Sequence, residues 1–161
     1  MTRLRHLLSI VTIAVAFTGC SKESHDDVAG ADHAHHHHAA PHGGTAVVLG
    51  DEVYQLEFVL DAATGTMTAY VLDGHMEKFI RIDVPSFEVI AIVDAERRPL
   101  IFQASANSAT GETVGDTSEF AAQADWLKTS TVFDAELGQL TIRGRTFSNV
   151  PFNFPAGNHQ H

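Results

Sequence analysis

Short runs of strand-forming residues, separated by turn residues, constrain the fold of this chain more than any other feature. From Thr45 onward the runs recur about every ten to fourteen residues, a spacing typical of an antiparallel sandwich or barrel. Val53–Leu60 alternates between apolar and polar side chains, which places Gln55 and Glu57 on the opposite face from the apolar residues. We therefore predict an all-β fold, a single small antiparallel β-sandwich of the immunoglobulin-like kind, spanning residues 42–153.

Eight runs are predicted as strands because they are rich in β-branched and aromatic residues and are bounded by turn residues. They are Thr45–Leu49, Val53–Leu60, Thr66–Leu72, Phe79–Val84, Phe87–Val93, Leu100–Ala104, Gln139–Ile142 and Thr146–Phe152. The large aromatic side chains are expected to form the core rather than a cofactor site, because such side chains dominate the energy of burial. They are Phe58, Phe87, Phe102, Phe120, Trp126, Phe133 and Phe147.

Three other segments of this region carry weaker signals. Asn107–Ser118 is polar and contains glycine, so it is predicted as a long loop. Glu119–Leu127 fits either a helix, through an apolar face at helical spacing, or a strand over Glu119–Gln123 followed by a turn. Residues 154–161 are expected to form a frayed tail that exposes the last histidines.

The first nineteen residues have the pattern of a signal peptide. Arg3 and Arg5 precede an apolar run, Leu7–Phe17, that is too short to span a bilayer. The run ends in Thr18-Gly19-Cys20, which resembles the bacterial lipobox, where the cysteine becomes the lipidated N-terminus of the mature protein. The alternative is an ordinary cleaved signal peptide followed by an incidental cysteine.

Cys20 is the only cysteine, so no intrachain disulfide can form. Lipidation explains it better than a free thiol in an oxidising compartment, and two or three acyl chains such as palmitate would anchor the protein stably. Ser21, rather than aspartate, follows the cysteine, which favours the outer membrane on its periplasmic side. The expected location is therefore the bacterial cell envelope, with the lipid as the membrane anchor.

The acidic charge of the chain bears on which partners it can bind. After removal of residues 1–19, eight basic residues face twenty acidic ones, a formal charge of −12 with neutral histidines. Such a surface disfavours nucleic acid and anionic lipid headgroups, and it is compatible with cations.

Seven of the eleven histidines lie between His25 and His42. The surrounding segment, residues 20–41, has little apolar content beyond alanine, and it is predicted to be a disordered tether. A short histidine-rich tract is a compositional sign of metal binding, with copper favoured over zinc on intrinsic affinity. The predicted ligands are His33, His35, His36, His37, His38, His42 and His75. The alternative is that the tract is a solvated spacer.

His42 and His75 stand outside the dense part of the tract. Pro41 restricts the chain before His42 and two glycines follow it, so a turn could present this imidazole from a fixed backbone. His75 lies in Asp73-Gly74-His75-Met76-Glu77 at a predicted strand end, a sequence that fits a polar loop with Met76 packed inward better than a second ligand cluster.

The segment His42-Gly43-Gly44, followed by Val47–Gly50 and by Tyr54–Val59, resembles a small bacterial lipoprotein domain with an HGG motif, a glycine turn and a Tyr-x-Leu-Glu strand. Similar stretches precede the periplasmic adaptor subunits of heavy-metal efflux systems. The resemblance implies a small β-sandwich-like domain, an envelope location and an association with metals. It extends to about Phe152, but an acidic residue separates Ser118 from Phe120 where the family pattern has a basic one.

No catalytic set is visible, since the chain lacks G-x-S-x-G, H-E-x-x-H and a phosphate-binding glycine loop. We therefore expect a non-enzyme that binds or buffers copper or zinc, with a metal-efflux component or another envelope protein as its partner. The alternative is a non-catalytic structural or protein-interaction lipoprotein.

Overall fold

The computed structural model describes residues 39–158. The predicted signal peptide, the lipid attachment site Cys20, the predicted tether up to residue 38 and the ligands His33 and His35–His38 lie outside the described residues, as do His159 and His161.

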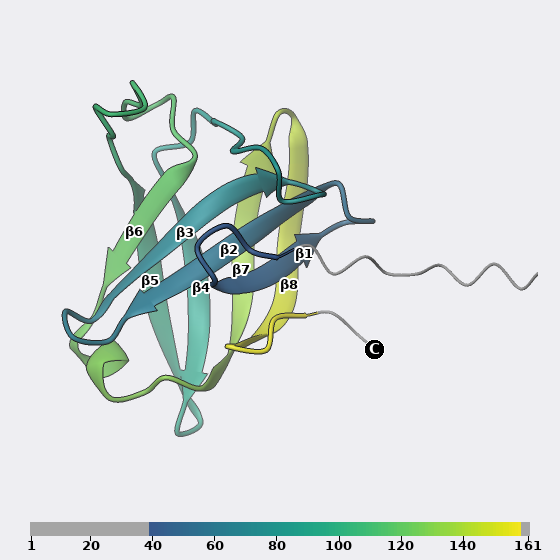
Figure 1. The fold of residues 1–161 in the computed structure, drawn as a ribbon. Coiled ribbons are helices and arrows are strands. Elements are labelled where there is room, and N and C mark those ends of the chain that lie inside the picture. Colours follow the sequence, from purple (N-terminus) through teal and green to yellow (C-terminus); the bar gives the residue numbers. More distant parts are fainter. Residues whose placement is uncertain (1–38, 159–161) are drawn as a thin grey trace, which may run out of the picture. The chain divides into compact units, whose positions relative to one another are not determined.

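Eight strands account for most of the described chain (Figure 1). They are β1 (Thr45–Leu49), β2 (Tyr54–Asp61), β3 (Thr66–Asp73), β4 (Ser86–Val93), β5 (Glu96–Ala104), β6 (Glu119–Gln123), β7 (Phe133–Ile142) and β8 (Arg145–Phe154). The helical element of residues 39–158 is a short 3-10 turn, η1 (Asp125–Lys128). Within the same residues, no helix has the length and apolar character needed to cross a membrane.

The strands form one antiparallel sheet in the order β1-β2-β3-β6-β5-β4-β7-β8. The prediction of a small antiparallel all-β domain is confirmed. Its layers belong to one continuous sheet that curls on itself, so that β1 and β8, the first and last strands in the order, come close together. The side chain of Asn158, beyond β8, bonds to both the N–H and the carbonyl of Val48 in β1.

The core follows from the alternation of side chains. In β4 every second residue is buried, and the same holds in β1 and in most of β7. Of the aromatic residues expected in the core, five are buried, and Trp126 and Phe147 are partly buried and pack against the others. Phe58 stacks on Phe152 at a centroid distance of 5.0 Å, which joins the two ends of the sheet through the core.

Three strand predictions differ from the structure by more than two residues, and one of them is β7, which begins at Phe133 and not at Gln139. Residues 79–84 form isolated bridges, Leu72 with Phe79 and Ile82 with Thr117, and do not make a strand. β5 begins at Glu96 and not at Leu100, because a two-residue turn at Asp94 and Ala95 reverses the chain directly after β4. Both turn residues have positive φ, the conformation that matches the twist of a tight hairpin.

The ambiguous segment after the long loop follows the second of its two interpretations. Residues 119–123 form β6, which pairs with β3, and the turn η1 comes next. The loop over residues 107–118 contains no strand, as predicted; it has two isolated bridges within itself and a third from Thr117 to Ile82.

The expectation of a frayed tail from residue 154 is wrong as far as residue 158. Phe154 is buried in the core, and Gly157 exchanges backbone hydrogen bonds with Asn153. Thr45 also donates a hydrogen bond to the carbonyl of Pro155. The tail is held because its polar groups satisfy the outer edge of β1, which a count of apolar residues cannot reveal.

Candidate functional site

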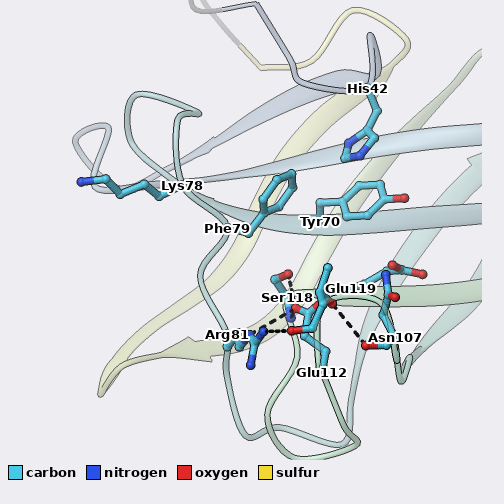
Figure 2. A pocket seen from close by; sticks show the side chains of 10 residues that line it. His42, Tyr70, Lys78, Phe79, Arg81, Asn107, Glu112, Ser118 and Glu119 are labelled. Atoms are coloured by element: carbon cyan, nitrogen blue, oxygen red, sulfur yellow. Dashed lines mark hydrogen bonds and ion pairs between the residues drawn. The ribbon is translucent and has the colours of Figure 1, made fainter.

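A row of polar side chains crosses the outer face of the sheet. Glu57 in β2, Tyr70 in β3 and Glu119 in β6 are register partners, so they lie next to one another on neighbouring strands. This face is covered in part by the turn that contains His42 and by the segment and loop that follow β3 and β5. A cavity of about 510 Å³ remains between them. Figure 2 shows the side chains that line it, which are His42, Tyr70, Lys78, Phe79, Arg81, Asn107, Thr110, Glu112, Ser118 and Glu119.

The best-defined feature of this site is the pairing of His42 with Glu57. The Glu57 side chain is fully buried, with a relative exposure of 0%. One carboxylate oxygen, Oε1, accepts hydrogen bonds from the backbone N–H groups of His42 and Gly44, at 2.7 and 2.9 Å. The other oxygen, Oε2, lies 2.8 Å from Nδ1 of His42. A buried carboxylate needs such partners, because an unpaired one is costly to remove from water.

The two glycines after His42 have different roles in this arrangement. Gly43 has a φ of +68°, a conformation that glycine adopts without the penalty of a side chain. Gly44 lies so close to β2 that a Cβ atom there would be 2.5 Å from the carbonyl oxygen of Phe58. The HGG sequence thus brings its backbone N–H groups onto a carboxylate thirteen residues from Gly44. Sequence reasoning placed His42 in a fixed turn but missed Glu57, whose position on the polar face of β2 suggested a solvent-exposed side chain.

The imidazole of His42 lies flat on Tyr70. The two ring centroids are 4.0 Å apart and the rings are inclined by 17°, and Phe79 approaches the imidazole from the side at 5.6 Å. Nδ1 of this ring faces Glu57. The other ring nitrogen, Nε2, has no hydrogen-bond partner within residues 39–158. The His42 side chain is 38% exposed, so Nε2 is the ring nitrogen of this residue that is left to bind a metal ion.

The environment of Tyr70 is electronegative. Burial raises the pKa of the Tyr70 hydroxyl above its ordinary value of 10.0, and the negative charges of Glu119 and Glu57 raise it further. The hydroxyl therefore stays protonated at neutral pH, as a neutral group between two carboxylates.

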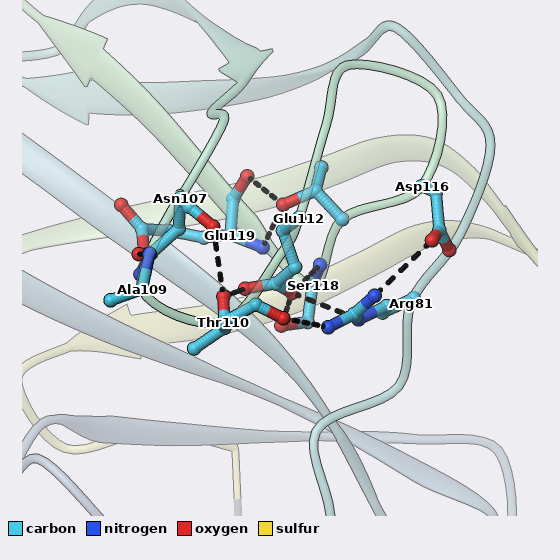
Figure 3. Close-up of polar contacts among 9 residues, drawn as sticks. Arg81, Asn107, Ala109, Thr110, Glu112, Asp116, Ser118 and Glu119 are labelled. Carbon is cyan, nitrogen blue, oxygen red and sulfur yellow. Dashed lines mark hydrogen bonds and ion pairs between the residues drawn. The ribbon is translucent and has the colours of Figure 1, made fainter.

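The far wall of the cavity is a polar network around Glu112 (Figure 3). This side chain is 7% exposed, and it accepts hydrogen bonds from the N–H and hydroxyl of Ser118 and from the hydroxyl of Thr110. Arg81 lies 3.7 Å from the Glu112 carboxylate and 3.2 Å from Asp116. Burial alone would raise the pKa of Glu112, but the hydrogen bonds and the Arg81 charge outweigh it and lower that pKa below 4.5.

His75, the other predicted ligand within the described residues, occupies a different position. It is exposed in the turn after β3, and it does not line the cavity that His42 lines. Asp73 caps this turn by accepting hydrogen bonds from the N–H groups of Glu77 and Lys78, and Met76 is buried. Within residues 39–158, no three side chains of the histidine, cysteine, aspartate and glutamate types gather into a metal-binding group.

Comparison with known proteins identified no similar protein. The chain matches no protein-family model, no curated protein and no solved structure.

Proposed function

We propose that this protein is a membrane-anchored lipoprotein of the bacterial envelope that binds or buffers a divalent transition metal, copper or zinc. Cys20 carries the lipid, and the metal ligands are the histidines of the tract, His33 and His35–His38, together with His42. We further propose that the protein passes its metal to an efflux component, and that it is not an enzyme.

The observation that carries this proposal is the geometry of His42. Metal-ligating histidines commonly donate their second ring N–H to a carboxylate, which fixes the tautomer and increases the basicity of the ligating nitrogen. Glu57 is placed to do this for Nδ1 and leaves Nε2 as the ligand atom. His42 follows His38 by four residues, so one oriented imidazole stands directly after a tract of unassigned ones.

The donor set favours a site that exchanges its metal. Imidazole nitrogen suits both copper and zinc, and copper binds more tightly on intrinsic affinity. Since residues 39–158 supply a single oriented imidazole, the remaining ligands would come from the tract. Such a site suits a carrier or buffer better than a catalyst, because a catalytic metal requires a preformed set of protein ligands.

A non-catalytic protein-interaction role is the second candidate, and one observation favours it. Ile92 and Ile101 are 39% and 45% exposed on β4 and β5, on the outer face of the sheet. An edge of the sheet offers less support, because Asn158 already occupies the backbone groups of Val48 in β1.

The test is isothermal titration of Cu²⁺ and Zn²⁺ into the protein lacking residues 1–20. We expect micromolar or tighter binding at pH 7 that weakens below about pH 6, where imidazoles protonate and can no longer ligate. The first variant changes His33, His35–His38 and His42 to alanine, and its loss of binding would establish the histidine site. His75→Ala is the matched control.

Two further variants divide the site into its parts. Deletion of residues 21–40 removes the tract, and Glu57→Gln keeps the shape of the side chain while removing its charge. We expect the deletion to abolish tight binding and Glu57→Gln to weaken it about tenfold or more. Equal, weak heats from the parent and the six-histidine variant would exclude metal binding and leave the interaction role.

A further inference from the structure

The cavity beside His42 has a chemical character that the proposed metal site does not use. Its volume of about 510 Å³ falls within the range typical of small-molecule sites. Its lining combines aromatic rings, carboxylates and two basic residues. The kind of ligand that the cavity can bind therefore depends on which of these charged side chains are not already paired with one another.

The basic residues of the lining are not available to an anion. Arg81 is shared between Glu112 and Asp116, and it also donates a hydrogen bond to the carbonyl of Thr110 at 2.5 Å. Lys78 is exposed, and its ammonium group points away from the cavity (Figure 2). The neighbouring carboxylates therefore already neutralise the one cationic group that faces inward.

One carboxylate remains unpaired. The side chain of Glu119 lines the cavity and is half-buried, yet within residues 39–158 it makes no hydrogen bond or ion pair. Burial and then the negative charge of Glu119 raise the pKa of the hydroxyl of Tyr70, the neighbour of Glu119 on β3. A half-buried carboxylate of this kind favours a cation.

Aromatic rings stand next to this carboxylate. Tyr70 and Phe79 have ring centroids 6.0 Å apart and meet edge to face, and Phe79 is 47% exposed although it is large and apolar. Exposed aromatic faces attract alkyl chains and the ammonium groups that those chains carry.

We propose that this cavity binds a protonated alkylamine, with its ammonium group paired to Glu119 and its hydrocarbon chain against Phe79 and Tyr70. The amine can be a free small molecule or the side chain of a lysine, since both present the same ammonium on an alkyl stem. The site uses no metal and none of the tract histidines His33 and His35–His38, although it adjoins the proposed ligand His42, whose imidazole lines the same cavity.

The experiment is a two-dimensional ¹H–¹⁵N NMR titration of the purified protein with pentylammonium chloride at pH 7, with EDTA present to remove metal. We expect saturable shifts at the amides of Tyr70, Phe79 and Glu119. Pentanol and pentanoate, with the same chain but no charge or the opposite charge, are expected to bind at least about tenfold more weakly, because a charge-assisted contact is lost. A lysine peptide with both termini capped, so that the side chain carries its only charge, is titrated in parallel. Comparison of its affinity with that of pentylammonium distinguishes a lysine side chain from a free amine as the ligand.

Variants distinguish a specific cation site from nonspecific hydrophobic binding. Glu119→Gln keeps the shape of the side chain and is expected to weaken pentylammonium binding about tenfold, while Phe79→Leu is expected to weaken pentylammonium and pentanol together. Glu88→Gln, an exposed glutamate on β4 outside the cavity, is the control and leaves binding unchanged. Equal binding of pentylammonium and pentanoate, or unchanged binding in a folded Glu119→Gln protein, would overturn the proposal.

Discussion

Nδ1 of His42 lies 2.8 Å from Oε2 of Glu57, whose side chain is fully buried. Glu57 also accepts the backbone N–H groups of His42 and Gly44, so this one side chain fastens the start of the folded domain to β2. The arrangement is therefore a structural element as well as a means of orienting the imidazole.

Glu57→Ala is expected to destabilise the protein by about 2 to 4 kcal/mol, because it leaves backbone N–H groups without their acceptor. Urea unfolding at pH 7 measures the change in the free energy of unfolding. Glu57→Gln should cost less, since its amide oxygen can still accept. Glu88→Ala, on an exposed position of β4, is the control and should stay within about 0.5 kcal/mol of the parent. A Glu57→Ala protein as stable as the control would mean that the three contacts contribute nothing.

The two glycines of the same turn should respond differently to substitution. Gly44→Ala places a Cβ 2.5 Å from the carbonyl oxygen of Phe58, and the turn must move away from β2 to accommodate it. Gly43→Ala meets no atom within 4 Å and costs only the strain of a positive φ, about 1 kcal/mol. Thermal unfolding of the two variants should therefore show the larger loss for Gly44→Ala. The reverse order would show that the turn does not approach β2 this closely.

Most of the fold could be predicted from the sequence, because alternating runs specify strands and their buried faces. The prediction failed where a run was apolar for another reason. Residues 79–84 contain Ile80 and Ile82, both buried in the core, but they pair with the end of β3 and with Thr117 only through isolated bridges. Alternation alone cannot distinguish a strand with a continuous ladder from an extended segment that forms only isolated bridges.

The candidate site was only half visible in the sequence. His42 was identified through the proline and glycines around it, whereas Glu57 was placed on a polar face that is in fact covered by the same turn. A signal was nevertheless present, because the resemblance to the HGG lipoprotein domain included both the HGG motif and the glutamate of the following strand. Which side of a strand a distant turn will cover depends on tertiary contacts, so alternation alone could not connect the two.

The Tyr70 hydroxyl offers a spectroscopic test of the site. Its pKa is raised by burial and by the charges of Glu119 and Glu57, so it should ionise above pH 10.0 in the folded protein. Tyr70 keeps its proton in the folded state while the unfolded chain loses it, so this residue's contribution to stability is lost as the pH rises above 10.0. Ultraviolet titration of the parent and of Tyr70→Phe identifies this tyrosine. Glu119→Gln should lower the Tyr70 pKa but not restore it fully, because burial is the largest cause. An unchanged titration would place Glu119 away from the hydroxyl.

The pKa of Glu112 is shifted in the opposite direction from that of Tyr70, and its effect on stability is expected in acid. Its pKa in the folded protein is lowered below 4.5, because the hydrogen bonds from Ser118 and Thr110 and the charge of Arg81 outweigh the effect of burial. Below pH 4.5 the unfolded chain therefore binds a proton at this residue before the folded protein does. The stability that Glu112 contributes is present above pH 4.5 and is lost as the pH falls through its folded pKa.

Glu112→Gln removes this titration, so the variant should be less stable than the parent at pH 7 but should lose less stability between pH 7 and pH 3. Urea unfolding at both pH values measures the two differences. Equal acid losses in the parent and the variant would show that Glu112 titrates alike in the folded and unfolded states, and that the network around it does not hold its charge.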